Sequence, residues 1–304
     1  MRERNLQRVA IVSDTTACLL PEHVKEYGIA VVPLALIFED KVYQDGIDIS
    51  PADFYELLQQ AKKLPTTSGS SPDPYLEAYE KASKKAESIV CITEPSGFSA
   101  MFNSAKLAMD MARTTLAGVA IEVIECATAA AGLGLVTLAA ARASASGKAL
   151  KEVIDITKSV MSQVSLFAML DTLHYLVKGG RVPQAAALVN SVLQIKPVFT
   201  LNRGEAHTVA LSRTVEGAMK HILRMMEQKA VRGQPLHVVV MHANATDRAL
   251  ELRNRISAHF DCSELFITEF TPVMGVHTGP GLVGVAFYSD QPPLALTTNP
   301  KDKN

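Results

Sequence analysis

The sequence contains no tryptophan, only 6% aromatic residues and only four cysteines among its 304 residues. The cysteines are too scattered to form a Cys-x-x-Cys pair, which argues against a disulfide framework and against a thiolate metal site. We therefore expect reduced, mostly buried thiols in a cytoplasmic protein. They are Cys18, Cys91, Cys126 and Cys262.

The chain also lacks an excess of charge and a long apolar run. Lys and Arg total 30 and Asp and Glu total 31, without a long block of one sign, so we expect neither nucleic acid nor an anionic membrane as the main partner. The most apolar window, residues 126–141, is uncharged but shorter than the about 20 residues that a membrane span needs, so we predict a core helix there. The first ten residues, MRERNLQRVA, have no run suited to a signal peptide.

What is present is ample apolar material, 48% of the residues, in alternating patterns. The length suggests two domains at about 100–200 residues each. In the first half, apolar strand-like runs at 9–13, 30–38 and 89–92 alternate with helical patterns, which predicts an N-terminal wound parallel sheet with flanking helices. In the second half a hairpin turn, Asn-Arg-Gly-Glu at 202–205, predicts a mixed sheet. We predict an α/β fold with domains 1–164 and 165–304.

A polar turn at residues 93–99 joins a predicted strand to a predicted helix, and Ser99 stands where a helix N-cap is expected. A strand that turns into a helix leaves backbone N–H groups unpaired at the positive end of the helix dipole. This arrangement favours an anion site. The alternative is that Ser99 only caps its helix.

Other candidate groups leave alternatives open. Ser99 follows Gly97 as in a nucleophile elbow, but Met101 occupies the position that needs a small residue, which disfavours a hydrolase. Asp14 follows the first strand and could serve a phosphotransferase, although residue 16 is not a second aspartate. His277 lies in a predicted glycine-rich loop at 275–281, where it is either a solvent-exposed side chain or part of a ligand-binding site. The histidines show no metal-ligand spacing, so we predict no metal site. We also predict no catalytic residues.

Seven segments together resemble the DegV family, in the order of that family and over nearly the whole chain. They are DTTACLLPE at 14–22, VVPLALIFEDKVYQDGIDIS at 31–50, LPTTSGSSP at 64–72, ITEPSGFSAMFNSA at 92–105, TLHYLVKGGRV at 172–182, LQIKPVFTLNRGE at 193–205 and GVHTGPGLVGVAFY at 275–288.

The resemblance implies two α/β domains with a long-chain fatty acid between them and no cofactor. It implies an acyl carrier without turnover of its own, which presents the acid to a dihydroxyacetone-kinase-like fatty acid kinase. Thr67, Ser99 and His277 match the carboxylate-binding positions of the family, and Arg181 matches an arginine linked to work with the kinase. A ligand-sensing module without a kinase is a further alternative. Further possible pocket positions are Ser68, Ser96, Ala100, Thr278 and Gly279.

The chain departs from the usual family pattern near these positions. Ala100 and Met101 stand where the family usually has Gly-Thr, and Gly69 and Ser70 stand where it usually has Gln-Pro. The serine and threonine that would bind the carboxylate are retained.

Overall fold

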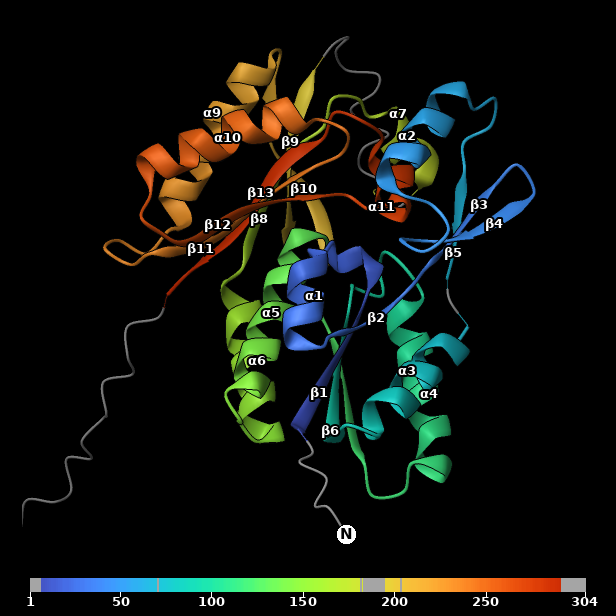
Figure 1. The fold of residues 1–304 in the computed structure, drawn as a ribbon. Coiled ribbons are helices and arrows are strands. Elements are labelled where there is room, and N and C mark those ends of the chain that lie inside the picture. The colour runs from blue at the N-terminus through green and yellow to red at the C-terminus, as the bar shows by residue number, and fades with distance from the viewer. Residues whose placement is uncertain (1–6, 70, 181, 183–194, 203, 291–304) are drawn as a thin grey trace, which may run out of the picture.

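The computed structural model describes residues 7–69, 71–180, 182, 195–202 and 204–290, and they fold around two large β-sheets (Figure 1). The first sheet is fully parallel, with strand order β2-β1-β6-β7. Its strands are β1 (Gln7–Asp14), β2 (Ala30–Val32), β6 (Ala86–Thr93) and β7 (Ala120–Glu125). The parallel sheet predicted for the first half of the chain is thus confirmed.

Both faces of the parallel sheet are covered by helices, which the strand alternation explains. In β6, Ile89 and Cys91 belong to the apolar cluster with α3 and α4, whereas Val90 and Ile92 belong to the cluster with α5 and α6. Because successive side chains point to opposite faces, an uninterrupted apolar run is what a doubly covered strand requires. The helices are α1 (Pro21–Tyr27), α3 (Asp73–Ser83), α4 (Met101–Thr115), α5 (Ala131–Ala145) and α6 (Leu150–Gln163).

The second sheet has six strands in the order β10-β9-β8-β13-β11-β12 and is mixed, as predicted. Only β11 and β12 pair in parallel. Helices α9 and α10 pack on one face, and α5 contacts both this sheet and the parallel one. The bounds are β8 (Ser165–Met169), β9 (Lys196–Asn202), β10 (Glu205–Ser212), α9 (Val215–Lys229), β11 (Leu236–His242), α10 (Thr246–His259), β12 (Cys262–Glu269) and β13 (Val283–Ser289).

Helix α5 lies between the sheets because almost every side chain on it is apolar or small. All of its residues except Arg142 and Ala145 are buried. A helix that is apolar all round belongs in a core rather than on a surface. No helix among the described residues is long and apolar enough to cross a membrane.

A third sheet, with order β4-β3-β5, was not predicted. The single strand expected at 30–38 is interrupted at Pro33, which has no N–H to offer to a ladder. Residues before the proline form β2, and the residues after it turn away as β3 (Ala35–Phe38). Residues 64–72 show no hydrophobic periodicity and predict a loop, but this segment contributes β5 (Thr66–Ser68), which pairs antiparallel with β3. The hairpin partner is β4 (Lys41–Gln44) and the adjoining helix is α2 (Pro51–Gln60).

Two further expectations need correction. The glycine-rich segment expected to be a loop at 275–281 is helical as far as Thr278, in α11 (Pro272–Thr278), which begins with proline at its first position. Helix α4 begins at Met101 and not directly after Ser99. Pro183 predicts the start of a further helix that runs to about residue 193, and residues 183–193 lie outside the described residues, beyond α7 (His174–Gly179).

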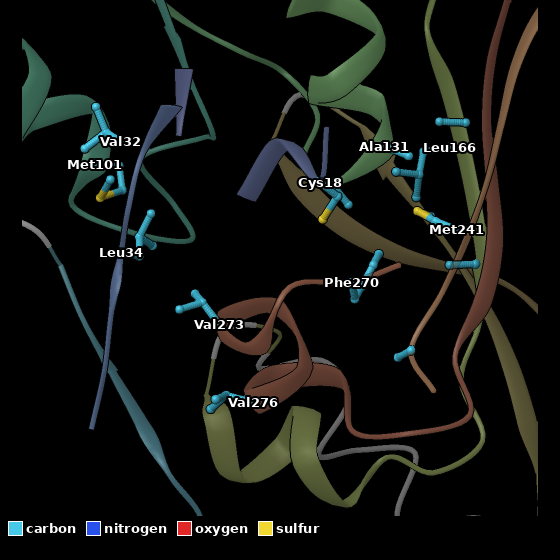
Figure 2. Close-up of a cluster of buried hydrophobic side chains, with 14 of the residues drawn as sticks. Cys18, Val32, Leu34, Met101, Ala131, Leu166, Met241, Phe270, Val273 and Val276 are labelled. Carbon is cyan, nitrogen blue, oxygen red and sulfur yellow. The ribbon is translucent and has the colours of Figure 1, made fainter. Parts of the chain in front are cut away.

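The small sheet and α2 lie beside α11 and α7, so early and late parts of the chain meet there (Figure 1). One apolar cluster extends from this region to both large sheets, and Figure 2 shows Leu34, Leu166, Phe270 and Val273 among its members. The first sheet uses residues up to Glu125 and the second begins at Ser165. We keep 1–164 and 165–304 as proposed domain limits.

Candidate functional site

A cavity of about 140 Å³ lies between the two large sheets, and its wall is mainly apolar. Leu34, Leu166, Met241, Phe270 and Val273 line it, and all five are labelled in Figure 2. They come from the segment after β2, from the six-stranded sheet and from the chain around α11. The polar side chains on the wall are those of Thr16, Thr67, Glu94, Ser99, His277 and Thr278.

Thr67 and His277 form a direct contact although 210 residues separate them. Oγ1 of Thr67 lies 3.0 Å from Nε2 of His277, within hydrogen-bond distance. Thr67 is held by β5, where it pairs with Leu36, and His277 is held by α11, which packs against β3, β5 and α2. Both side chains are half-buried and line the cavity. The small sheet therefore brings the threonine to the histidine.

Ser99 lines the same cavity from the turn between β6 and α4. Its Oγ accepts a hydrogen bond of 3.2 Å from the Met101 N–H, and its own N–H donates to the Pro95 carbonyl. Ser99 therefore accepts from the first N–H of α4 and lies one residue before the N-cap position. All three residues predicted to meet a carboxylate lie on the wall of one cavity.

The additional pocket positions differ in where the structure places them. Thr278 lines the cavity, with its hydroxyl donating to the Met274 carbonyl at 3.1 Å. Ser68 is exposed, and Ser96 donates twice to the Glu125 carboxylate, so neither lies on the cavity wall. Ala100 and Gly279 do not line it either. Of the five, only Thr278 is part of this wall.

Two polar wall residues were not singled out from the sequence. Thr16 follows β1 and Glu94 follows β6, and both are buried. Their position directly after neighbouring parallel strands was the available signal, because such ends meet at one edge of the sheet. The sequence does not show which of several residues after a strand turns inward.

Asp14, the alternative phosphotransfer group, is fully buried and absent from the cavity wall. Its carboxylate accepts hydrogen bonds from the N–H and hydroxyl of Thr16 and from the Tyr75 hydroxyl, the last at 3.2 Å. Burial raises its pKa to about 6 despite these bonds. The aspartate therefore caps the short helix at Thr15–Ala17 (η1) and holds Tyr75.

Arg181, predicted to couple to a partner, lies outside the described residues. The glycines before it are described. Gly180 ends α7 with φ +68°, and its N–H donates to the carbonyls of Leu176 and Val177. This left-handed cap suits a residue without a Cβ.

Comparison with known proteins agrees with the fold. The family model described as "Uncharacterised protein, DegV family" matches residues 8–290. A DegV domain-containing protein of Streptomyces coelicolor is 33% identical over 93% of this chain and 99% of its own length.

Two solved structures share the fold. A DegV family protein from Thermus thermophilus, whose structure is described by its fatty acid binding, is 26% identical with a TM-score of 0.86, over 93% of this chain and all of that one. DegV of Bacillus subtilis, described as a fatty acid binding protein, is also 26% identical, with a TM-score of 0.84 over 93% of this chain and all of that chain. The two-domain α/β fold and the family match agree over nearly the full length, and the chain therefore belongs to the DegV family.

Proposed function

We propose that this protein binds a long-chain fatty acid, with the carboxylate at Thr67, Ser99 and His277 and the tail in the apolar cavity. The observation that carries this proposal is the convergence of three hydrogen-bonding side chains, far apart in sequence, on one mainly apolar wall. The fatty acid binding described for the relatives from Thermus thermophilus and Bacillus subtilis supports the same ligand class.

The head group would meet donors of the right kind. If His277 Nε2–H donates to Oγ1 of Thr67, the threonine hydroxyl is left to donate to a carboxylate oxygen, and His277 contributes to the head-group site by orienting Thr67. Ser99 Oγ already accepts from the Met101 N–H, so its own hydroxyl proton is also available to a ligand. Hydrogen bonds to an ionised acceptor are stronger than those between neutral groups. The cavity would therefore favour a fatty acid over its neutral ester.

The tail would supply most of the affinity. Burial contributes about 0.8 kcal/mol per methylene, so about ten buried methylenes contribute on the order of 8 kcal/mol before the costs of binding. A net value near that size corresponds to about micromolar affinity. Wall residues from the six-stranded sheet, and from the segments that follow strands of the parallel sheet, would enclose the chain.

We further propose that the protein is a cytoplasmic carrier without cofactor or turnover of its own, which presents the acid to a fatty acid kinase. The hydrolase alternative is disfavoured by the fully buried Met101, two residues after Ser99. The phosphotransferase alternative is disfavoured because Asp14 is buried away from the cavity. Retention of Arg181 after two glycines favours the kinase carrier over a sensing module without a kinase.

Mass spectrometry of the purified protein after organic extraction tests the ligand class. We expect one fatty acid per chain, because an apolar cavity takes up lipid from the expression host. An extract without lipid, from protein that also fails to take up palmitate or oleate, would overturn the proposal.

A further inference from the structure

The wall of the apolar cavity carries a second polar spot, formed by Thr16 and Glu94. Thr16 is 1% exposed and Glu94 is 5% exposed, so both polar side chains are buried beside the space proposed for the acyl tail. An alkyl chain offers no hydrogen bond, and a buried polar group that faces such a chain loses the partner that water would provide. These two groups therefore point to a ligand that is not alkyl throughout.

The two residues lie on one wall because their strands are neighbours. Thr16 follows β1 and Glu94 follows β6, and these strands pair in parallel with Val12 beside Cys91. The carboxyl ends of neighbouring parallel strands lie at one edge of a sheet, which is the edge where ligands of α/β sheets bind. The turn that carries Ser99 follows β6 at the same edge.

The hydrogen bonds of Thr16 decide what this spot offers to a ligand. Its hydroxyl donates to the Asp14 carboxylate, and its N–H donates to the same oxygen at 3.0 Å. The hydroxyl proton is thereby used, and only the lone pairs of Oγ1 remain for a ligand. An ionised glutamate likewise only accepts, at about four sites, so Glu94 can take a ligand donor beside its protein partners. We call Thr16 and Glu94 the acceptor pair.

The head-group site has the opposite character, because the hydroxyls of Thr67 and Ser99 are assigned there as donors. Glu94 precedes Ser99 in a turn that is closed by two N–H groups, those of Phe98 and Ser99, which donate to the Pro95 carbonyl at 3.0 and 3.4 Å. Five residues span at most about 18 Å even when extended, and this turn folds back on itself. The acceptor pair therefore lies towards the carboxylate end of the bound chain.

We propose that the preferred ligand is a fatty acid with a hydroxyl group on the carboxyl half of its chain, and that this hydroxyl donates to the acceptor pair. The inference rests on the proposed function and narrows its ligand class. A hydroxyl supplies the donor that Thr16 and Glu94 lack, whereas an oxo group at the same carbon only accepts. An unsubstituted methylene supplies nothing. A site built around a hydroxyl rejects analogues that lack it, because its buried polar groups are then left without that partner.

Calorimetric titration of the full chain tests the inference with stearate, with its 3-, 6-, 9- and 17-hydroxy derivatives and with the matching oxo acids. We expect one of the first three hydroxy acids to bind about 10-fold more tightly than stearate, near the lower end for a bond to a charged acceptor. The 17-hydroxy acid should bind no more tightly than stearate, and the oxo acid that matches the preferred hydroxy acid should bind less tightly. If none of the hydroxy acids binds more tightly than stearate, the inference is overturned.

Glu94→Gln assigns the preference to the acceptor pair, because it replaces one acceptor oxygen by an NH₂ donor of nearly the same shape. We expect the preference for the hydroxy acid over stearate to fall below about threefold, the range of a bond between neutral groups. The matching oxo acid should gain affinity relative to the hydroxy acid. Glu87→Gln is the control, since Glu87 is exposed on β6 and lies off the cavity wall. A purely structural role of Glu94 would change all three affinities equally, and that result would overturn the assignment.

The wild-type titrations do not depend on the folding of any variant, and they separate this inference from the proposed function. A protein that binds stearate, and binds no hydroxy acid more tightly, would retain fatty acid binding and lose the inference. A protein that binds none of these acids would lose the proposed function itself.

Discussion

Gly179 and His277 are packed so closely that only a residue without a side chain fits beside the histidine ring. A Cβ built on Gly179 would lie 2.8 Å from Nδ1 of His277 and 3.7 Å from its Cγ. In the sequence, the two glycines at 179–180 predict only a break in the chain. The structure gives the first of them a packing role, because it sets how closely α7 approaches the ring that contacts Thr67.

Gly179→Ala should therefore displace the His277 ring and weaken the head-group site. We expect palmitate affinity to fall about 10-fold, near the lower end for a lost bond to a charged acceptor. The free energy of unfolding should change little, because the cost of displacing the His277 ring is offset by the higher helix propensity of alanine, about 1 kcal/mol relative to glycine. Calorimetric titration with palmitate measures the loss. The control is Gly97→Ala, whose Cβ would meet nothing closer than 3.7 Å, and unchanged palmitate binding by Gly179→Ala would contradict the role given to the glycine.

Removing a head-group hydroxyl should cost affinity for the acid and not for its ester. We expect Ser99→Ala or Thr67→Val to weaken palmitate binding by about 1.5–3 kcal/mol, or roughly 10–150-fold. Methyl palmitate should bind the wild type less well and lose little more in either variant. Ser68→Ala is the matched control, since Ser68 is exposed and lies off the cavity wall. Equal losses for the acid and the ester would show that these hydroxyls do not meet the carboxylate.

The tail should be sensitive to the size of Ala168, a buried cavity residue on β8. Ala168→Leu adds three carbons to the wall, and we expect at least a 10-fold loss for palmitate and a smaller one for octanoate. Overpacking also costs about 1–3 kcal/mol of stability, so the free energy of unfolding is measured alongside. Leu166→Met, a volume-conserving change on the same wall, should retain palmitate binding. If both acids lose equally, the tail does not pass Ala168.

Arg181→Ala should leave lipid affinity intact and lower the rate at which a fatty acid kinase uses the bound acid. The basis is the position of the arginine after two glycines, as in the family resemblance. The measurement pairs a palmitate titration with phosphoryl transfer from ATP in the presence of a kinase. Loss of lipid affinity in this variant would instead assign the arginine to the pocket.

Stability at acid pH should depend on Glu264, which joins α5 to the six-stranded sheet. Its carboxylate accepts bonds of 2.7 and 2.6 Å from Arg142 and one of 2.6 Å from His237. Burial alone would raise its pKa, but these partners lower the pKa to about 2 from its ordinary 4.5. A lowered pKa stabilises the folded state above about pH 4.5, and this contribution is lost as the pH falls towards 2.

Glu264→Gln should therefore lower the free energy of unfolding by about 1–3 kcal/mol at pH 7. It should also flatten the decline in stability between pH 5 and pH 2. Urea unfolding at a series of pH values measures both effects. Glu251→Gln, which removes an exposed partner of Arg255, is the control and should cost less than about 1 kcal/mol. A wild type and a Glu264 variant with parallel pH profiles would contradict the assignment.

The sequence by itself determined the elements whose signals are local. Apolar runs that alternate with helical patterns predicted the parallel sheet, and the uncharged run at 126–141 predicted the core helix α5. Ser50 followed by Pro51 predicts the start of a helix with the serine as its cap, and in α2 the Ser50 Oγ does accept from the Asp53 N–H at 3.2 Å. These signals are reliable because helix caps and strand alternation depend on residues only a few positions apart.

The tertiary structure alone decided what depends on distant segments. Pro33 ends one strand, but only packing against α11 decided that the next residues form a separate sheet that carries Thr67 to His277. The glycines near residue 277 suggested a loop, and contacts with α2 and α7 stabilise a helix there instead. The Thr67–His277 contact has no local pattern, because it unites two residues that are 210 positions apart in the sequence, and only folding brings them together.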